Sequence, residues 1–336
     1  MHFLRQNRKA SGPAVMLAGL LGIFSCSTPA PAHGAKQDIF PSHPVKIIVP
    51  YSPGGTTDSL ARVLATELSK KWHQSVVVEN RPGATGTIGL ETVATSPPDG
   101  YTLGIATFGN MLVANAIRPQ LRYKPLTDLV PVIQLAAPPL YLIANAKQPY
   151  SDVKGLIAYA KAHPDKLHYG SSGTGSSNHL FGELFASMAG ISMIHVPYKG
   201  SGPSVTDTLS GIIDLNFAPF PLIKGYIGSP RIKVLGVTSA HRSPVAPSIP
   251  TIAEAGLPGY EAISWFGVAA PAGIPKPLLE RLNKDINAAL KNDEVKHILA
   301  SEGTVPTGGS LAQARKSVEE GMRKWGGMVK KLHLIQ

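Results

Sequence analysis

From Pro44 onward the chain repeats one pattern: a short β-branched apolar run, a loop of glycine, serine, proline or threonine, and an amphipathic helical stretch. This alternation predicts strands and helices that build mainly parallel sheets with helices on their faces, because each helix carries the chain back to the start of the next strand. We therefore expect an α/β fold. In the first part of the chain the predicted strands are Val45–Val49, 76–78 and 101–106.

The pattern restarts after a proline-rich region at 135–142, which suggests a second sheet. About 300 residues exceed one ordinary hydrophobic core and fit two domains of about 150 residues each. The predicted strands of the second series are 167–170, 193–197, 213–218 and 233–238, with helices at 153–163, 180–188 and 205–209.

A last strand at 266–270 and helices at 276–290 and 311–331 would return to the first sheet. A lobe assembled from both ends of the chain needs crossing strands, and this is the geometry of a hinge. We therefore expect two lobes: residues 36–137 plus 265–336, and residues 138–264.

The first 35 residues have the three parts of an export signal. Basic residues without acids come first, followed by an apolar stretch at 14–24 and a segment of small residues at 25–35. The apolar stretch is shorter than the roughly 20 residues that a spanning helix needs. We expect a signal peptide at 1–35, cleaved near 32–35, and a periplasmic protein.

The single cysteine, Cys26, lies inside this leader. A lipoprotein site at Cys26 is the alternative to simple cleavage, although Phe24 is bulky where such sites prefer small residues. The rest of the chain therefore has neither disulfides nor cysteine-ligated metals. Of the formal net charge of +11, the three leader cations account for three, which leaves +8 for solubility or for attracting anions. Lysines and arginines are scattered, so no nucleic-acid partner is expected.

The loop at 51–58 follows the first strand and opens a helix. Ligands of open α/β sheets lie beyond the carboxyl ends of strands, where paired glycines expose backbone N–H groups and the helix offers its positive end. Carboxylate binding needs such donors. Asp58 would orient the loop, meet a ligand ammonium, or cap the helix. The candidates here are Tyr51, Ser52, Gly54, Gly55, Thr56, Thr57 and Asp58.

The loop at 170–179 has the same character in the second lobe, with hydroxyl residues beside glycines at a strand-to-helix junction. The functional interpretation is an anion-binding nest of backbone N–H groups, and the alternative is a flexible surface loop without a binding role. Its candidates are Ser171, Gly173, Ser176, Ser177 and His179.

Three further segments supply candidates. In the loop at 80–86, Arg81 would be a carboxylate fork or part of a structural ion pair. Tyr198 and Lys199 would add an aromatic wall and a cation, although Lys199 could equally be a solvated lysine. Thr107 and Asn110 follow the third strand of the first lobe.

The sequence offers little for catalysis. A serine hydrolase that acts on a small ester or amide is the rival hypothesis, with Ser172 or Ser176 as nucleophile beside His179 and Asp207, but no Gly-x-Ser-x-Gly elbow occurs. No nucleotide-binding motif is present. His179 and Glu183 have no third metal ligand at suitable spacing. We expect a binding protein with neither cofactor nor metal, and not an enzyme.

Five segments, in this order, resemble the solute receptors of tripartite tricarboxylate transporters, also called the Bug receptors. The resemblance covers nearly the whole chain after the leader. The segments are VPYSPGGTTD at 49–58, NRPGA at 80–84, PPDGYTL at 97–103, HVPYKG at 195–200 and PTIAEAG at 250–256.

The resemblance implies a periplasmic two-domain clamp of the Venus flytrap type, in which the loops at 53–58 and 171–179 grip a carboxylate, partly through waters. It implies partnership with the membrane subunits of such a transporter, and we expect a monomer. Family ligands include di- and tricarboxylates, acidic amino acids, nicotinate-like acids and aromatic acids. Thr56 stands where some relatives have a third glycine, and Phe108, Asn110 and Tyr198 would tune the choice of ligand.

Overall fold

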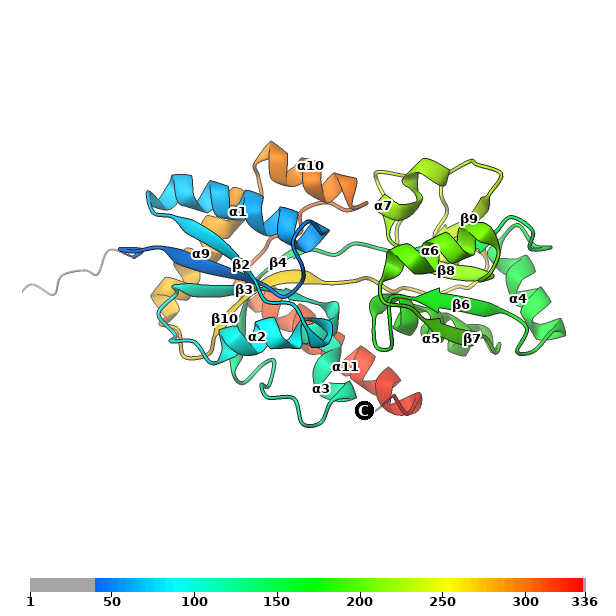
Figure 1. Cartoon of the computed structure of the whole chain (residues 1–336), viewed down its shortest axis with the longest axis horizontal. Coiled ribbons are helices and arrows are strands. Elements are labelled where there is room, and N and C mark those ends of the chain that lie inside the picture. The colour runs from blue at the N-terminus through cyan, green and yellow to red at the C-terminus, as the bar shows by residue number, and fades with distance from the viewer. Residues whose placement is uncertain (1–39, 335–336) are drawn as a thin grey trace, which may run out of the picture. The chain divides into compact units, whose positions relative to one another are not determined.

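In a computed structural model the described residues are 40–334, with the side chain of Thr56 excepted. The predicted signal peptide, its cleavage site and Cys26 lie outside them. Residues 41–334 form two lobes, each a sheet with helices on both faces (Figure 1). The two-lobed α/β fold expected from the sequence is confirmed.

The first sheet has the strand order β2-β1-β3-β10-β4. β1 pairs in parallel with β2 and β3, whereas β10 pairs antiparallel with both β3 and β4. Four of the five strands therefore run in one direction and β10 alone runs against them, so the sheet is mixed but mainly parallel. The strands are β1 (Val45–Val49), β2 (Val76–Asn80), β3 (Thr102–Thr107), β4 (Leu129–Ala136) and β10 (Phe266–Pro271).

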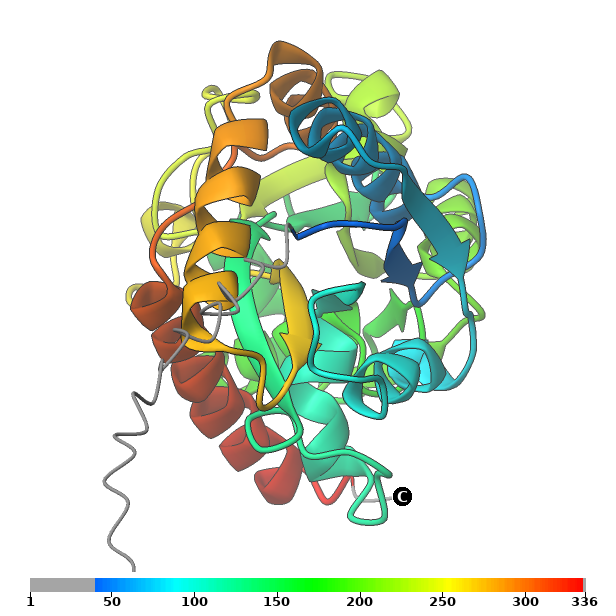
Figure 2. The same cartoon turned by 90° about the vertical axis from the view of Figure 1, so that its left-hand side faces the viewer.

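Helices from both ends of the chain cover the first sheet (Figure 2). α1 and α9 pack together, and the indole N–H of Trp72 donates to the buried carboxylate of Asp285 at 2.7 Å. The helical elements are α1 (Thr56–Trp72), η1 (Ala84–Gly86), α2 (Thr87–Ala94), η2 (Phe108–Val113), α3 (Ala114–Ile117), α9 (Lys276–Ala289), α10 (Asp293–Ser301) and α11 (Leu311–Lys331).

The second sheet repeats this topology with the order β7-β6-β8-β5-β9. β5 alone is antiparallel to its neighbours. Its strands are β5 (Tyr141–Asn145), β6 (His168–Ser171), β7 (Ile194–Pro197), β8 (Leu215–Ala218) and β9 (Ile232–Val237). Its helical elements are α4 (Val153–Ala162), α5 (Ser177–Ala189), α6 (Ser201–Ser210), α7 (Phe220–Ile223), η3 (Lys224–Tyr226) and α8 (Ile252–Ala255).

Two segments cross between the sheets side by side. One joins β4 to β5 and the other leads into β10. They are bonded to each other, because the Ser264 N–H donates to the Pro138 carbonyl at 3.1 Å and Pro139 forms a bridge with Ile263. In each sheet, the strand that runs against the others is the one that a crossing segment enters.

The C-terminal helix α11 contacts both lobes (Figure 1). It packs on β4 and η2 in the first lobe and reaches α5 in the second. Its Trp325 packs against both Phe108 and Phe181, with centroid distances of 5.1 Å to each ring, and these two rings also contact each other at 5.6 Å. Within residues 40–334 no helix is long and apolar enough to span a bilayer.

Candidate functional site

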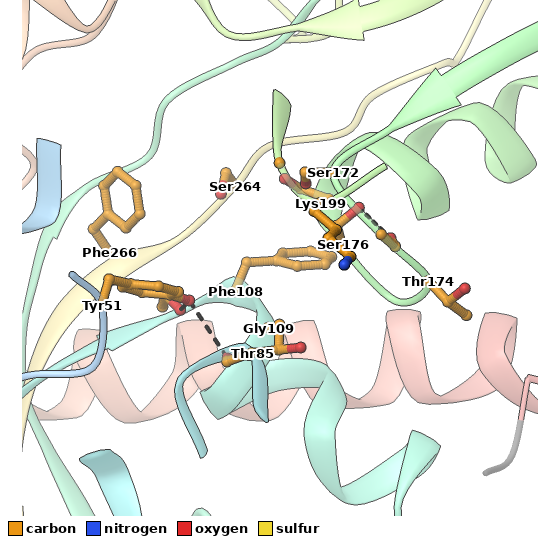
Figure 3. Close-up of a pocket in the computed structure, with 14 residues that line it drawn as sticks. Tyr51, Thr85, Phe108, Gly109, Ser172, Thr174, Ser176, Lys199, Ser264 and Phe266 are labelled. Atoms are coloured by element: carbon orange, nitrogen blue, oxygen red, sulfur yellow. Dashed lines mark hydrogen bonds between the residues drawn. The ribbon is translucent and has the colours of Figure 1, made fainter. Parts of the chain in front are cut away.

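A cavity of about 420 Å³ lies where the strand ends of the two sheets face each other. In Figure 3, Tyr51 and Phe266 lie on one side of it, and Ser172, Ser176 and Lys199 lie on the other. A second compartment of about 340 Å³ adjoins the first. Both compartments are lined by Tyr51, Ser172, Ser177, Ser264 and Phe266. We refer to the two compartments together as the cleft.

The carboxylate of Asp58 holds the first-lobe loop in place. It accepts hydrogen bonds from the Gly54 N–H at 3.0 Å, from Arg62 Nε at 2.9 Å and from Asn80 Nδ2 at 2.9 Å. The bond from Arg62 is the main reason that the pKa of Asp58 is lowered to about 2, so the group is ionised at neutral pH. Asp58 lies in the first turn of α1, and the N-cap position belongs to Gly55. Of the interpretations open from the sequence, the contacts match loop orientation.

Tyr51 and Thr107 meet at the floor of the cleft. Their hydroxyl oxygens are 2.8 Å apart, and burial raises the pKa of Tyr51 so that the phenol keeps its proton. Behind them Asn110 is fully buried, and its Oδ1 accepts from the Thr107 N–H at 2.7 Å. Tyr123 donates its hydroxyl to the Asn110 carbonyl at 2.6 Å. Asn110 therefore supports the floor from below.

The second-lobe loop is closely bonded to its surroundings. Ser176 caps α5: its hydroxyl donates to the Gly173 carbonyl at 2.6 Å and accepts from the His179 N–H at 3.4 Å. Ser172 donates to Asn178 Oδ1 at 2.7 Å, and Asn178 is itself buried. This loop therefore has fixed hydroxyl positions. α5 begins at the cleft. The N–H groups of its first turn have no carbonyl acceptor within the helix and are available at that end.

His179 lies behind this loop, not in the cleft. Its side chain is buried, its Nδ1 accepts from the Gly175 N–H at 3.1 Å, and its ring stacks on His195 at a centroid distance of 3.8 Å. Burial lowers the pKa of His179 to about 3, with a smaller contribution from His195, and burial lowers the pKa of His195 to about 4. Both rings are neutral at neutral pH. Ser171 is fully buried beside them, with its Oγ 2.7 Å from His195 Nε2.

The remaining candidates divide between the cleft and its surroundings. Arg81 pairs with Glu79, with Nε 2.6 Å from Oε1, which matches the structural ion pair. Tyr198 donates its hydroxyl to Asp207 at 2.6 Å, and burial is the largest cause that raises the pKa of Tyr198 to about 12. Lys199 lines the first compartment.

The structure thus brings together most of the residues expected from the sequence. The candidates that line one or both compartments are Tyr51, Ser52, Gly55, Thr57, Asp58, Thr107, Gly173, Ser176, Ser177 and Lys199. Those outside both linings are Gly54, Arg81, Asn110, Ser171, His179 and Tyr198. The side chain of Thr56 is not described.

Several lining residues were not proposed from the sequence. Thr85 lies in the loop at 80–86, where attention to hydroxyl residues would have found it. Ser264 and Phe266 come from the crossing segment before and within β10. Their place in the cleft depends on that segment passing between the lobes, for which their local sequence carries no signal.

The residues of the hydrolase alternative are engaged elsewhere. Ser176 donates to the Gly173 carbonyl, His179 accepts from Gly175, and Asp207 accepts from Tyr198. The described hydroxyl–imidazole pair, Ser171 with His195, is closed off because Ser171 has no exposed surface. No group of three or more His, Cys, Asp or Glu within residues 40–334 could hold a metal ion.

Known proteins share both the sequence and the fold. The model of the tripartite tricarboxylate transporter family receptor matches residues 60–334. Protein BugT of Bordetella pertussis is 38% identical over 315 residues, which cover 94% of this chain and 96% of BugT.

Solved structures give the same result. Rpa4515 of R. palustris, solved with adipate, is 40% identical with a TM-score of 0.76, covering 87% of this chain and 97% of that one. MatC of Rhodopseudomonas palustris, solved with bound malate, is 31% identical with a TM-score of 0.73, covering 86% of this chain and 100% of that one. The chain therefore belongs to the tripartite tricarboxylate transporter receptor family, the Bug receptors.

Proposed function

We propose that this protein is an extracytoplasmic solute receptor that closes its two lobes on one small carboxylate. The observation that carries the proposal is the cleft, which is lined from both lobes by hydroxyl groups and glycine-containing loops at the starts of helices. Relatives solved with adipate and with malate support the same ligand class.

The chemistry of the lining suits an anion. Helix starts bring partial positive charge and backbone donors, and α1 and α5 both begin at the cleft. Ser177 and Thr107 add hydroxyls that donate to a carboxylate, and Lys199 adds a full positive charge. The Ser176 hydroxyl would donate to the ligand by turning from the Gly173 carbonyl. We also propose that the ligand directly contacts five further lining residues: Tyr51, Ser52, Gly55, Thr57 and Gly173.

Closure gives these donors their strength. A small carboxylate held by one loop stays largely hydrated, whereas loops from two lobes exclude water and strengthen each hydrogen bond to the anion. We propose that the lobes comprise residues 36–137 plus 265–336 and residues 138–264, and that the paired crossing segments form the hinge. Hinges of this kind consist of a few residues at the ends of elements.

We propose a periplasmic monomer that passes its ligand to the membrane subunits of a tripartite tricarboxylate-type transporter, or reports it to a sensor. The basic and then apolar leader supports export. Intact mass of the protein from its native host is expected to show a start between His33 and Gln37. A full-length chain in the cytoplasm would contradict export, and a lipid-modified Cys26 would indicate a membrane-tethered form.

A thermal-shift panel of dicarboxylates, tricarboxylates, amino acids and aromatic acids tests the function. Ligand at 100 times its dissociation constant adds about 2.7 kcal/mol of stability, which is an easily measured shift. We expect a shift with a small carboxylic acid that is recovered chemically unchanged. No shift with any acid would contradict the receptor, and turnover of the acid or of a derived ester would favour the hydrolase.

A further inference from the structure

Two stacked histidines lie directly under the second-lobe loop of the cleft. His179 comes from α5 and His195 from β7, and their ring planes differ by 19° at a centroid distance of 3.8 Å. Neither ring lines a compartment of the cleft. Buried imidazoles that contact a binding loop from behind are suited to fixing its shape.

Each ring is tied to a glycine N–H of the loop. Gly175 donates directly to His179 Nδ1 at 3.1 Å. Gly173 donates to Ser171 Oγ at 3.0 Å, and that oxygen is 2.7 Å from His195 Nε2. The donation from Gly175 assigns the lone pair of His179 to Nδ1, so the neutral ring carries its proton on Nε2.

Glu183 of α5 and Tyr169 of β6 face the pair. Glu183 on α5 has Oε1 at 3.8 Å from His179 Nε2, but it already accepts the Tyr169 hydroxyl of β6 at 2.6 Å. The Tyr169 ring lies 5.1 Å from the His195 ring. A proton added at His179 Nδ1 would point at the Gly175 N–H, so the hydrogen bond between them would be lost.

Gly175 also contacts the opposite lobe. Its φ is +79°, and a Cβ at this position would overlap Ile117 Cδ1 of α3. Gly175 therefore contacts His179 of its own lobe on one side and Ile117 of the first lobe on the other. A shift of Gly175 would disturb the loop and the contact between the lobes together.

We infer that His179, stacked on His195, is a positioning residue of the cleft: its neutral ring holds Gly175 in place, and protonation of the pair releases the loop and weakens ligand binding. The link to binding rests on the proposed function, whereas the link to Gly175 does not. A solute would then be bound at neutral pH and released more readily in acid.

Linkage sets the size of the effect. The ordered loop holds the pKa of His179 near 3, below the ordinary value of about 6.5 that a hydrated ring regains. Below pH 6.5, each unit of pH therefore favours the open loop by up to about tenfold per histidine. Near pH 7.5 the pair has almost no effect of this kind.

The first test needs no ligand. In the ¹⁵N-labelled full-length exported chain, the hydrogen-exchange protection factor of the Gly175 amide is measured at pH 7.5, 6.5 and 5.5. We compare wild type with His179→Asn, whose Oδ1 replaces the Nδ1 acceptor but does not titrate, and with His179→Leu, which has no acceptor. His163→Asn, at the exposed C-cap of α4, is the matched control.

Wild type and His163→Asn are expected to lose up to about tenfold in Gly175 protection between pH 6.5 and 5.5. His179→Asn should lose less protection than wild type, because only His195 still takes up a proton, and His179→Leu should be unprotected throughout. A flat wild-type profile overturns the inference even if a variant fails to fold. So does a His179→Asn profile that follows wild type, or protection that survives in His179→Leu.

The second test measures adipate binding by calorimetry at pH 7.5 and 5.5. The ratio of wild-type to His179→Asn affinity at each pH cancels the titration of adipate itself. This ratio should fall at pH 5.5 in proportion to the share of free protein whose loop is open, by at most about tenfold. An unchanged ratio with measurable binding overturns the coupling and leaves the receptor function intact. If adipate and the rest of the acid panel bind neither protein while Gly175 behaves as expected, the proposed function fails and the positioning role remains.

Discussion

At the scale of single residues, adjacent glycines in the first-lobe loop have different reasons to be glycine. Gly54 has φ +89°, which other residues rarely adopt. Gly55 has φ −87° and ψ 169°, an extended conformation open to any residue, and a Cβ there would meet no atom within 4 Å. The backbone therefore requires glycine at Gly54, whereas at Gly55 the requirement is space in the cleft.

Gly55→Leu is therefore expected to fold normally and to bind its carboxylate at least about tenfold more weakly, because the side chain blocks approach to the backbone. Calorimetry with the acid found by the thermal-shift panel measures this effect. Gly327→Leu in α11, where a Cβ likewise meets no atom within 4 Å, controls for added bulk. Unchanged affinity in Gly55→Leu would remove the first-lobe loop from the site.

The sequence predicts which kinds of residue form the site better than it predicts where each side chain points. The two loops of glycine and hydroxyl residues that follow strands contribute residues to the lining of the cleft, where the sequence predicted a site. Sequence does not say which side of such a loop faces solvent, because this depends on how the following helix is rotated in its packing. His179 turns inward for this reason, Ser171 is buried as the last residue of β6, and Asn110 supports the floor instead of lining it.

At the scale of elements, periodicity located most strands and helices, and it failed where burial removes periodicity. All five residues of β5 are buried, so the strand has no polar face to alternate with its apolar one. β4 contains Pro131 beside a register shift in its pairing with β10. Together with the prolines between them, these strands resembled a linker. The short α10, which begins at the N-cap Asn292, was also not expected.

The start of α5 depends on one hydroxyl. Ser176 caps the helix and closes the loop onto Gly173. Ser176→Ala is expected to lower the free energy of unfolding by about 1 kcal/mol through loss of the cap. It should also weaken carboxylate binding by about 1.5 to 3 kcal/mol if the hydroxyl donates directly to the charged group, and by less if a water lies between them.

Urea unfolding and calorimetry on the same Ser176→Ala sample separate these two effects. Ser310→Ala, which removes the cap of α11 outside the cleft, is the control: it should lose stability without losing affinity. Equal affinity in Ser176→Ala and wild type would show that this hydroxyl serves the helix alone.

At the scale of the whole molecule, buried titratable groups give two separate ranges of acid sensitivity. The pKa values of His179 and His195 are lowered to about 3 and about 4 by burial, so the unfolded chain takes up protons that the folded one refuses. Stability is therefore complete above about pH 6.5 and falls as the pH drops below it. The pKa of Asp58 is also lowered, to about 2, so its contribution is lost only below about pH 4.

The free energy of unfolding is thus expected to fall by about 1 kcal/mol per pH unit per histidine between pH 6 and 4.5. Denaturant titrations of wild type and His179→Asn at pH 7.5, 6.0, 5.0 and 4.5 measure this slope. The variant should have a shallower slope, because one of the two histidines is gone. Parallel slopes would mean that the buried pair does not govern acid stability.

The strand order also determines which part of the chain can fold first when the chain becomes available starting with its N-terminal end. The first sheet has β10 between β3 and β4, so neither strand has its β10 partner until residues 266–271 arrive. All strands of the second sheet lie between Tyr141 and Val237, so that sheet is complete earlier. We expect the second lobe to form first, with the first half of the first lobe remaining open until most of the chain has been delivered.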